Sequence, residues 1–176
     1  MRFLRPSFAL SVLVLGFTLT IFLCFTLTIS NANASSFLHK LDGDWRGRGT
    51  LKTHGETPKK EALACRISAK YNQDKSNLAI SGRCGAAAGT TSFQSTLIET
   101  SNGTVTGKPI LQRGDLAKIT LTGKTKSTSL KLVGADDKNQ IHVTFILQGD
   151  RKFQSQSGRS QAGKAINTLV INWKKQ

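Results

Sequence analysis

Residues 63–84 read LACRISAKYNQDKSNLAISGRC, and the stretch contains two alternating runs on either side of a polar turn. In 63–71 the larger apolar side chains stand at odd positions, whereas in 78–84 they stand at even positions. Such alternation is typical of a β-strand with one buried face. The residues between the runs, NQDKSN, have the composition of a turn. The stretch therefore predicts an antiparallel hairpin.

Cys65 and Cys84 set the register of this hairpin. If the two cysteines face each other, Ile67 lies opposite Gly82, every inward pair falls on the same face, and the turn lies at the midpoint. Directly opposed residues are close enough for a disulfide, which would stabilise the fold by about 3 kcal/mol in the chain-entropy model. The spacing is not C-x-x-C and no histidine is nearby, so we predict a structural disulfide rather than a redox or metal pair.

The rest of the chain contains further short alternating runs separated by turn residues. Residues 141–147 form the clearest run, and 117–122 alternate in the same way, whereas 154–164 are polar and predict a mobile loop. The one helical candidate is 35–41. We therefore expect an all-β domain, an antiparallel up-and-down meander that closes into a barrel of about 8–10 strands with a short N-terminal helix. A two-sheet sandwich remains an alternative, while outward Lys and Arg speak against a membrane barrel.

The first residues have the pattern of an export signal. Arg2 and Arg5 precede an uncharged, largely apolar stretch over 8–29, and the small residues after it end in an A-x-A site. This pattern predicts a signal peptide over 1–34 and a single domain over 35–176. The apolar stretch is also long enough to remain as an uncleaved anchor. In both cases the domain is exported, so we expect a periplasmic or secreted protein.

The exported part is strongly basic. The leader holds two arginines and no acid, so residues 35–176 carry 23 of the 25 basic residues and all 10 acidic ones, a net charge of +13. Most basic side chains fall in outward phases of the strands. This pattern fits either an anionic partner, such as an envelope polymer, a lipid or an acidic protein, or basic faces that only keep the domain soluble. Nucleic acid is not expected outside the cell. The candidate anion patch consists of Arg46, Arg48, Lys52, Arg66 and Lys70.

The start of the exported part carries a known motif. After the short helix comes Leu41-Asp42-Gly43-Asp44-Trp45, and this resembles the opening of calycin barrels such as the lipocalins. The resemblance extends to small exported bacterial proteins of unknown role that share this start and a cysteine hairpin. It implies a calycin-like barrel in which Gly43 and Trp45 form the plug of the closed end. In that family a basic side chain of the last strand often covers the tryptophan, and Lys174 is the candidate here.

The function expected from these observations is binding without catalysis. Histidines are scattered and no nucleophile motif or inward carboxylate pair is present, so we expect no enzyme, no cofactor and no metal site. A barrel of about eight strands just holds one small ligand, and the favoured function is lipocalin-like binding of a small apolar molecule; the alternative is a basic module for anionic envelope surfaces. The candidate lining consists of Tyr71, Phe93, Phe145 and Trp173. Small inward residues leave two interpretations, a cavity or tight packing; they are Gly47, Gly49, Ala69, Gly82, Ala117 and Thr128.

Overall fold

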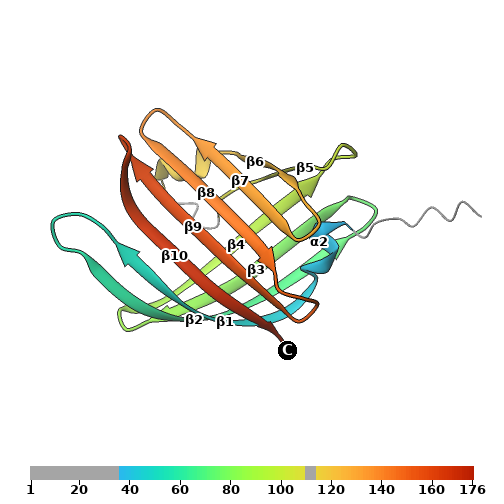
Figure 1. Cartoon of the computed structure of the whole chain (residues 1–176), viewed down its shortest axis with the longest axis horizontal. Helices are drawn as coiled ribbons and strands as arrows, with labels where there is room; N and C mark the ends of the chain where they lie inside the picture. The colour runs from blue at the N-terminus through green and yellow to red at the C-terminus, as the bar shows by residue number, and fades with distance from the viewer. Residues whose placement is uncertain (1–35, 110–113) are drawn as a thin grey trace, which may run out of the picture. The chain divides into compact units, whose positions relative to one another are not determined.

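The computed structural model describes residues 36–109 and 114–176, which form a closed antiparallel barrel (Figure 1). Each of the ten strands pairs with the next one along the chain, and β10 returns to pair with β1. The predicted up-and-down barrel is therefore confirmed and the sandwich alternative is excluded. Closure gives every strand a neighbour on both sides, although β4 pairs with β5 only over Leu97, Ile98 and Glu99. The predicted leader lies outside the described residues, and within them no helix is long and apolar enough to cross a membrane.

Within the described residues, two short helical segments and ten strands follow each other. In order they are α2 (Phe37–Lys40), β1 (Gly43–Thr53), β2 (Lys59–Asn72), β3 (Asn77–Ala86), β4 (Gly89–Glu99), β5 (Thr104–Gly107), the 3-10 helix η1 (Gly114–Lys118), β6 (Leu121–Thr125), β7 (Ser129–Ala135), β8 (Asn139–Leu147), β9 (Lys152–Gln161) and β10 (Lys164–Lys175).

The β2–β3 hairpin has the register that the cysteines predict. Cys65 pairs with Cys84, and Ile67 lies opposite Gly82. The two sulfur atoms are bonded in a disulfide. Cys65 is buried and Cys84 is half-buried, so the bond lies on the inner side of the barrel wall.

One end of the barrel is closed by α2 and the start of β1. Ser36 caps the helix, since its Oγ accepts a hydrogen bond from the backbone N–H of Leu38 at 3.2 Å. Phe37, Leu38 and Leu41 turn into the barrel and are at most 4% exposed. The predicted short helix is confirmed, and its apolar side covers the end of the barrel that we call the closed end. The opposite end is called the open end.

Glycines in the wall are positions where neighbouring chains come closest. A Cβ on Gly47 would lie 2.6 Å from both Ile171 Cγ2 and Trp173 Cε3. A Cβ on Gly82 would lie 2.5 Å from the carbonyl oxygen of Arg66. Glycine inside a strand often marks such a close approach. At these two positions the small residues therefore permit tight packing and do not leave a cavity.

The expectation of a mobile loop over 154–164 is wrong. Residues Lys152–Gln161 form β9, which pairs with β8 on one side and β10 on the other. The prediction failed because it looked for alternating apolar residues, and β9 after Phe153 has serines in the inward phase. Backbone pairing with two neighbours stabilises this strand without an apolar pattern of its own.

The expected strand over 117–122 is also wrong in its first half. Gly114–Lys118 form the 3-10 helix η1, and β6 begins only at Leu121. In a 3-10 helix side chains three residues apart lie above each other, which places Leu116 and Ile119 on the same side. The N–H of Ile119 donates to the carbonyl oxygen of Leu116 at 3.3 Å, and Ile119 is 3% exposed. Alternation of Ala117, Ile119 and Leu121 therefore reflected burial but not strand geometry.

Candidate functional site

An aromatic stack extends from the closed end into the barrel. The Trp45 ring meets Phe153 edge-on, with centroids 4.8 Å apart, and Phe153 stacks on Trp173 at 5.6 Å with an interplanar angle of 17°. Phe145 lies beside Phe153 at 6.3 Å. Trp45 is fully buried, and its Nε1 donates to the carbonyl oxygen of Leu41 at 2.9 Å. The stack forms a solid floor beneath the interior of the barrel, which we call the lumen.

The basic residue over the plug tryptophan is Lys175 and not Lys174. Lys175 Nζ lies 5.4 Å from the centroid of the Trp45 ring, within the range of a cation–π interaction. Trp173 faces inward, so the alternation of β10 sends Lys174 outward and Lys175 back inward. Gly43 has a φ of +125°, and a Cβ there would lie 2.5 Å from Lys175 Cε. Only glycine at this position allows the lysine to cross to the tryptophan.

The lumen becomes accessible to solvent toward the open end. There Leu63, Phe93, Val143 and Leu169 occupy inward phases of their strands and pack against the core, yet each is only half-buried. Near the closed end, by contrast, the inward side chain of Leu78 is fully buried. Because alternation directs all these side chains to the inner face, their partial exposure means that solvent reaches part of the interior.

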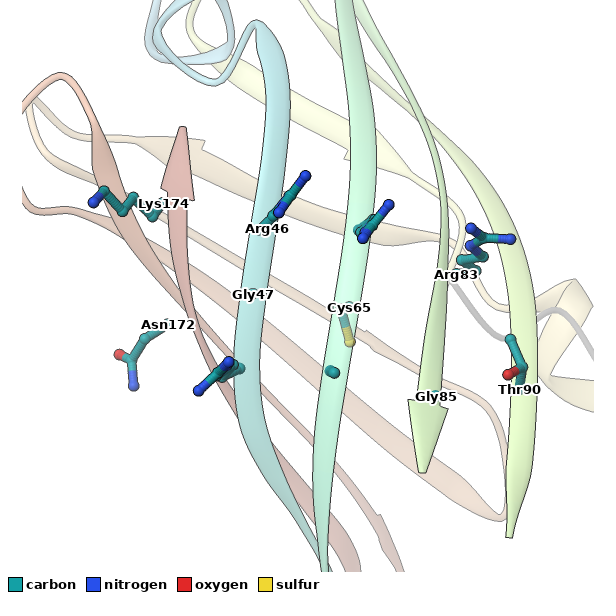
Figure 2. A pocket seen from close by; sticks show the side chains of 11 residues that line it. Arg46, Gly47, Cys65, Arg83, Gly85, Thr90, Asn172 and Lys174 are labelled. Carbon is teal, nitrogen blue, oxygen red and sulfur yellow. The ribbon is translucent and has the colours of Figure 1, made fainter. Parts of the chain in front are cut away.

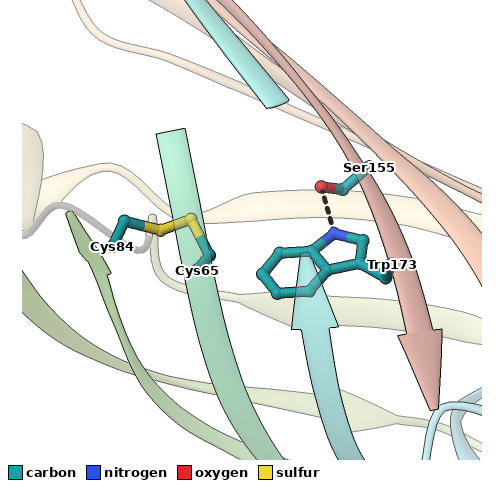
Figure 3. The surroundings of a disulfide bond; sticks show 4 residues. All are labelled: Cys65, Cys84, Ser155 and Trp173. Carbon is teal, nitrogen blue, oxygen red and sulfur yellow. Dashed lines mark hydrogen bonds between the residues drawn. A yellow bond between two sulfur atoms is a disulfide. The ribbon is translucent and has the colours of Figure 1, made fainter. Parts of the chain in front are cut away.

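Polar side chains of β9 share this lumen. Because Phe153 faces inward, alternation brings Ser155, Ser157 and Arg159 to the inner face as well. Ser155 Oγ accepts a hydrogen bond from Trp173 Nε1 at 2.8 Å, and both residues lie in the surroundings of the disulfide (Figure 3). These three residues were missed in the sequence because 154–164 was interpreted as a loop; the parity of Phe153 is the signal that could have found them.

At the rim of the open end a small polar network involves Arg159. Arg159 Nε donates to Asn139 Oδ1 at 2.9 Å, and Asn139 is 7% exposed. The Asn139 amide in turn donates to the carboxylate of Asp136. This hydrogen bond, with those from the backbone N–H groups of Lys138 and Asn139 and the nearby charge of Arg159, lowers the pKa of Asp136 below its usual value. The network holds the Arg159 side chain in place at the rim.

The four candidate lining residues are not all in the same region. Phe145 and Trp173 belong to the aromatic stack and are each 6% exposed. Phe93 is half-buried in the accessible part of the lumen. Tyr71 lies at the closed end, where its ring contacts that of His39 edge-on at 5.5 Å. The structure thus brings Phe93 to the accessible lumen, places Phe145 and Trp173 at its floor, and separates Tyr71 from it.

The outer face carries a row of basic side chains that crosses five neighbouring strands. Lys152 of β9 pairs with Lys174 of β10, and Lys174 pairs with Arg46 of β1. Arg46 pairs with Arg66 of β2, which pairs with Arg83 of β3. All five side chains are exposed. We call this set, Lys152, Lys174, Arg46, Arg66 and Arg83, the cationic row.

A hollow of about 640 Å³ lies alongside the cationic row (Figure 2). Its floor includes Ala64 and Gly85, which pair with each other and fill little space. Arg48 pairs with Ala64 on one side, and Thr90 pairs with Gly85 on the other. The long basic side chains of the row extend outward beside Ala64 and Gly85. Because Ala64 has a short side chain and Gly85 has none, the surface is hollowed there.

The candidate anion patch is divided by this geometry. Arg46, Arg48 and Arg66 line the hollow, whereas Lys52 and Lys70 lie on the same strands but are not part of its lining. Sequence reasoning missed Arg83, although the cysteine register already places it opposite Arg66. It also missed Lys174 as a member, because the contact between β1 and β10 exists only once the barrel is closed. Among the described residues no group of three potential metal ligands is found.

Comparison with known proteins finds a similar fold among solved structures. No protein-family model matches the sequence, and no curated protein does so either. Among solved structures, an S-type phycobiliprotein lyase from Guillardia theta is similar with a TM-score of 0.61 at 10% identity, over 80% of this chain and 90% of that one. A protein of unknown function from the DUF3598 family of Nostoc punctiforme has a TM-score of 0.52 at 8% identity, over 79% of this chain and 48% of that one. The chain therefore shares a closed antiparallel barrel fold with these proteins, and identities of 8–10% concern the fold alone.

Proposed function

We propose that the barrel binds a small, mainly apolar molecule in the lumen, without transforming it. The observation that carries this proposal is the partial exposure of inward apolar side chains at the open end, of which Leu63, Phe93, Val143 and Leu169 are the members. Exposed apolar surface in a concave site is the usual basis of small-molecule binding. Such surface is costly to leave in water, and a ligand that covers it recovers part of that cost.

The chemistry of the lumen defines the class of ligand. Its apolar part would contact the leucines, Phe93 and Val143, while a polar group at one end would face Ser157 and Arg159 on β9. Arg159 already shares one hydrogen bond with Asn139, and its remaining N–H groups can donate to a carboxylate or hydroxyl of the ligand. We therefore expect molecules with an apolar body and one polar or acidic end to bind better than entirely apolar ones.

The barrel type supports this proposal at the level of the fold. The similar solved structures share the up-and-down closed barrel, an architecture whose open end and interior are suited to small ligands. A fold is compatible with many activities, so the exposed inward side chains are stronger support for ligand binding than the similar structures are.

The proposal is tested with a neutral fluorescent probe, whose binding should weaken when a substitution fills the lumen. N-phenyl-1-naphthylamine is titrated into the full-length protein, and native mass spectrometry of the same preparation looks for a co-purified molecule. Val143→Phe should lower probe affinity at least ten-fold, because the larger ring fills the lumen from β8. Val133→Phe is the matched control, because Val133 faces outward and is 46% exposed, and it should change affinity less than two-fold. Equal affinities for both variants would place the probe outside the lumen and overturn the proposal.

We further propose that the domain acts outside the cytoplasm, in the periplasm or as a secreted protein. Support comes from the leader pattern over 1–34 and from the disulfide, since disulfides persist mainly in oxidising compartments. The intact mass of protein recovered from the cell envelope or medium should match a chain that begins near Ser35 and holds no free thiol. Recovery from the cytoplasm with both thiols reduced would contradict this proposal.

A further inference from the structure

The cationic row is unusual because like charges stand directly opposite each other on four successive strand pairs. Lys152, Lys174, Arg46, Arg66 and Arg83 follow each other from β9 to β3 without interruption. Directly opposed like charges destabilise a sheet. Acidic residues alternating with these positions would have removed the repulsion. The repulsion within the row therefore lowers the stability of the free protein, and a bound anionic partner would neutralise it.

Within the described parts of the chain the row has no acidic side chain as an ion-pair partner. Arg46 Nε donates instead to the amide oxygen of Gln176 at 2.8 Å. The guanidinium groups of Arg66 and Arg83 are exposed beside the hollow. Arginine can offer two parallel N–H donors to a carboxylate, sulfate or phosphate group, and three of the five members of the row are arginines. The side chains are thus suited to oxyanions rather than only to diffuse negative charge.

The shape of the site favours a linear polymer over a membrane. Neighbouring strands are about 4.8 Å apart, so the five members extend over roughly 20 Å around the barrel wall. The outer wall of a closed barrel is convex in this direction, and a flat bilayer would touch only part of the row at a time. A flexible chain can bend around the wall and place successive acidic groups at successive strands.

The residues next to the row indicate what kind of polymer fits. Ala64 and Gly85 form a low floor, with Thr90 beside Gly85 and Arg48 beside Ala64. Asn172 of β10 pairs with Arg48, so a hydroxyl and an amide group also line the hollow. Such groups suit the hydroxyls of sugars. None of the residues that line the hollow is aromatic, whereas proteins that bind single-stranded nucleic acids usually stack bases on aromatic rings. The lining therefore favours a polysaccharide over a nucleic acid.

We propose that the cationic row and the adjoining hollow bind a linear acidic polysaccharide on the outer face of the barrel. Carboxylate or sulfate groups of the polymer pair with Arg46, Arg66 and Arg83, and the sugar rings lie over Ala64 and Gly85. Lys152 and Lys174 extend the contact along the polymer. This site is separate from the lumen, because the side chains of the row occupy the outward phases of strands whose inward phases face the lumen.

The test compares two double substitutions that remove the same charge from different parts of the outer face. Arg66→Gln with Arg83→Gln removes two members of the row. Lys124→Gln with Lys131→Gln is the matched control, because these two exposed lysines also face each other, on β6 and β7. Binding of the full-length protein to polygalacturonate is measured by calorimetry at several salt concentrations, with neutral dextran, anionic phospholipid vesicles and single-stranded DNA as comparison probes.

We expect polygalacturonate to bind at low salt and to lose affinity steeply as salt is added, because each paired charge releases counterions. The arginine variant should bind at least ten-fold more weakly and the lysine variant within two-fold of the unchanged protein. An equal loss in both variants would indicate a diffuse positive field and overturn the proposal. So would tighter binding to vesicles or DNA than to the polysaccharide, or no binding at low salt. Unchanged binding of the neutral probe to the arginine variant would show that the lumen is intact.

Discussion

The two ends of the barrel are built from the same alternating strands but differ in how deeply their inward side chains are buried. At the closed end Trp45, Leu78 and Phe153 are at most 2% exposed. Toward the open end Leu63 and Phe93 point to the same interior and are half-buried. The difference arises because α2 and the aromatic stack cover one end, while the described residues place no comparable cluster of rings in the accessible part of the lumen.

This contrast separates stability from binding within one small domain. Large apolar side chains that are fully removed from water contribute most to the free energy of unfolding. Inward side chains that remain partly exposed to solvent contribute less to the free energy of unfolding and are available to a ligand. We therefore expect substitutions at the closed end to affect mainly stability, and substitutions at the open end to affect mainly binding.

The largest effect is expected at the plug. Trp45→Ala removes a fully buried ring together with its contacts to Phe153 and Lys175. It should lower the free energy of unfolding by about 3–5 kcal/mol, measured by urea denaturation. Val133→Ala, at an exposed position on the outer wall, is the control and should cost less than about 0.5 kcal/mol. A loss below about 1 kcal/mol for Trp45→Ala would contradict the role of the plug.

The next effect concerns the disulfide. Replacing Cys65 and Cys84 together by alanine should lower the free energy of unfolding by about 3 kcal/mol, because the unfolded chain is no longer closed into a loop. Adding a reducing agent should destabilise the unchanged protein by a similar amount and leave the double variant unaffected. If reductant changed both proteins equally, its effect would not act through this bond.

A matched pair of leucines tests the contrast between the ends directly. Leu78→Ala at the closed end should cost about 2–5 kcal/mol, since the side chain is fully buried. Leu63→Ala is half-buried in the lumen and should cost about 1 kcal/mol. Only Leu63→Ala should weaken binding of the neutral probe. Equal losses of stability at both positions would show that the two ends are equally packed.

The smallest effect concerns the rim of the open end and its response to acid. The hydrogen bonds from Asn139 and the backbone N–H groups lower the pKa of Asp136. A carboxylate with a lowered pKa contributes stability above its unfolded pKa, and this contribution is lost as the pH falls through the folded value. Between pH 5 and pH 2 the unchanged protein should therefore lose slightly more stability than Asp136→Asn, as followed by urea midpoints. A larger loss in the variant would reverse the expected sign.

Much of the fold could be derived from local patterns. The alternation in 63–71 and 78–84 and the positions of Cys65 and Cys84 predicted a hairpin in the register that the structure has. The short helix and the barrel class followed in the same way. Strand β9 was missed, because its inward positions after Phe153 hold polar residues and its pairing depends on two neighbouring strands. η1 was missed because a spacing of two between apolar residues also fits a tight helical turn followed by a strand.

The candidate sites required more than these patterns. The outward phase of Arg46, Arg48 and Arg66 was visible in the chain, as was the inward phase of Phe93 and Phe145. The difference between a filled and an accessible interior was not visible, because it depends on which rings meet across the barrel. Gly47, for instance, has no side chain, and the ring of Trp173 on β10 occupies the space beside it.

Amino-acid order alone establishes which side of most strands faces water, where most turns lie, how the cysteine hairpin is aligned and that residues 35–176 are strongly basic. These are properties of residues near each other in the chain, where alternation and turn chemistry act. The continuous cationic row, the placement of Lys175 rather than Lys174 over Trp45 and the accessible lumen arise only on closure. Each depends on β10 returning to β1, which joins residues more than a hundred positions apart and thereby sets distances that no local pattern contains.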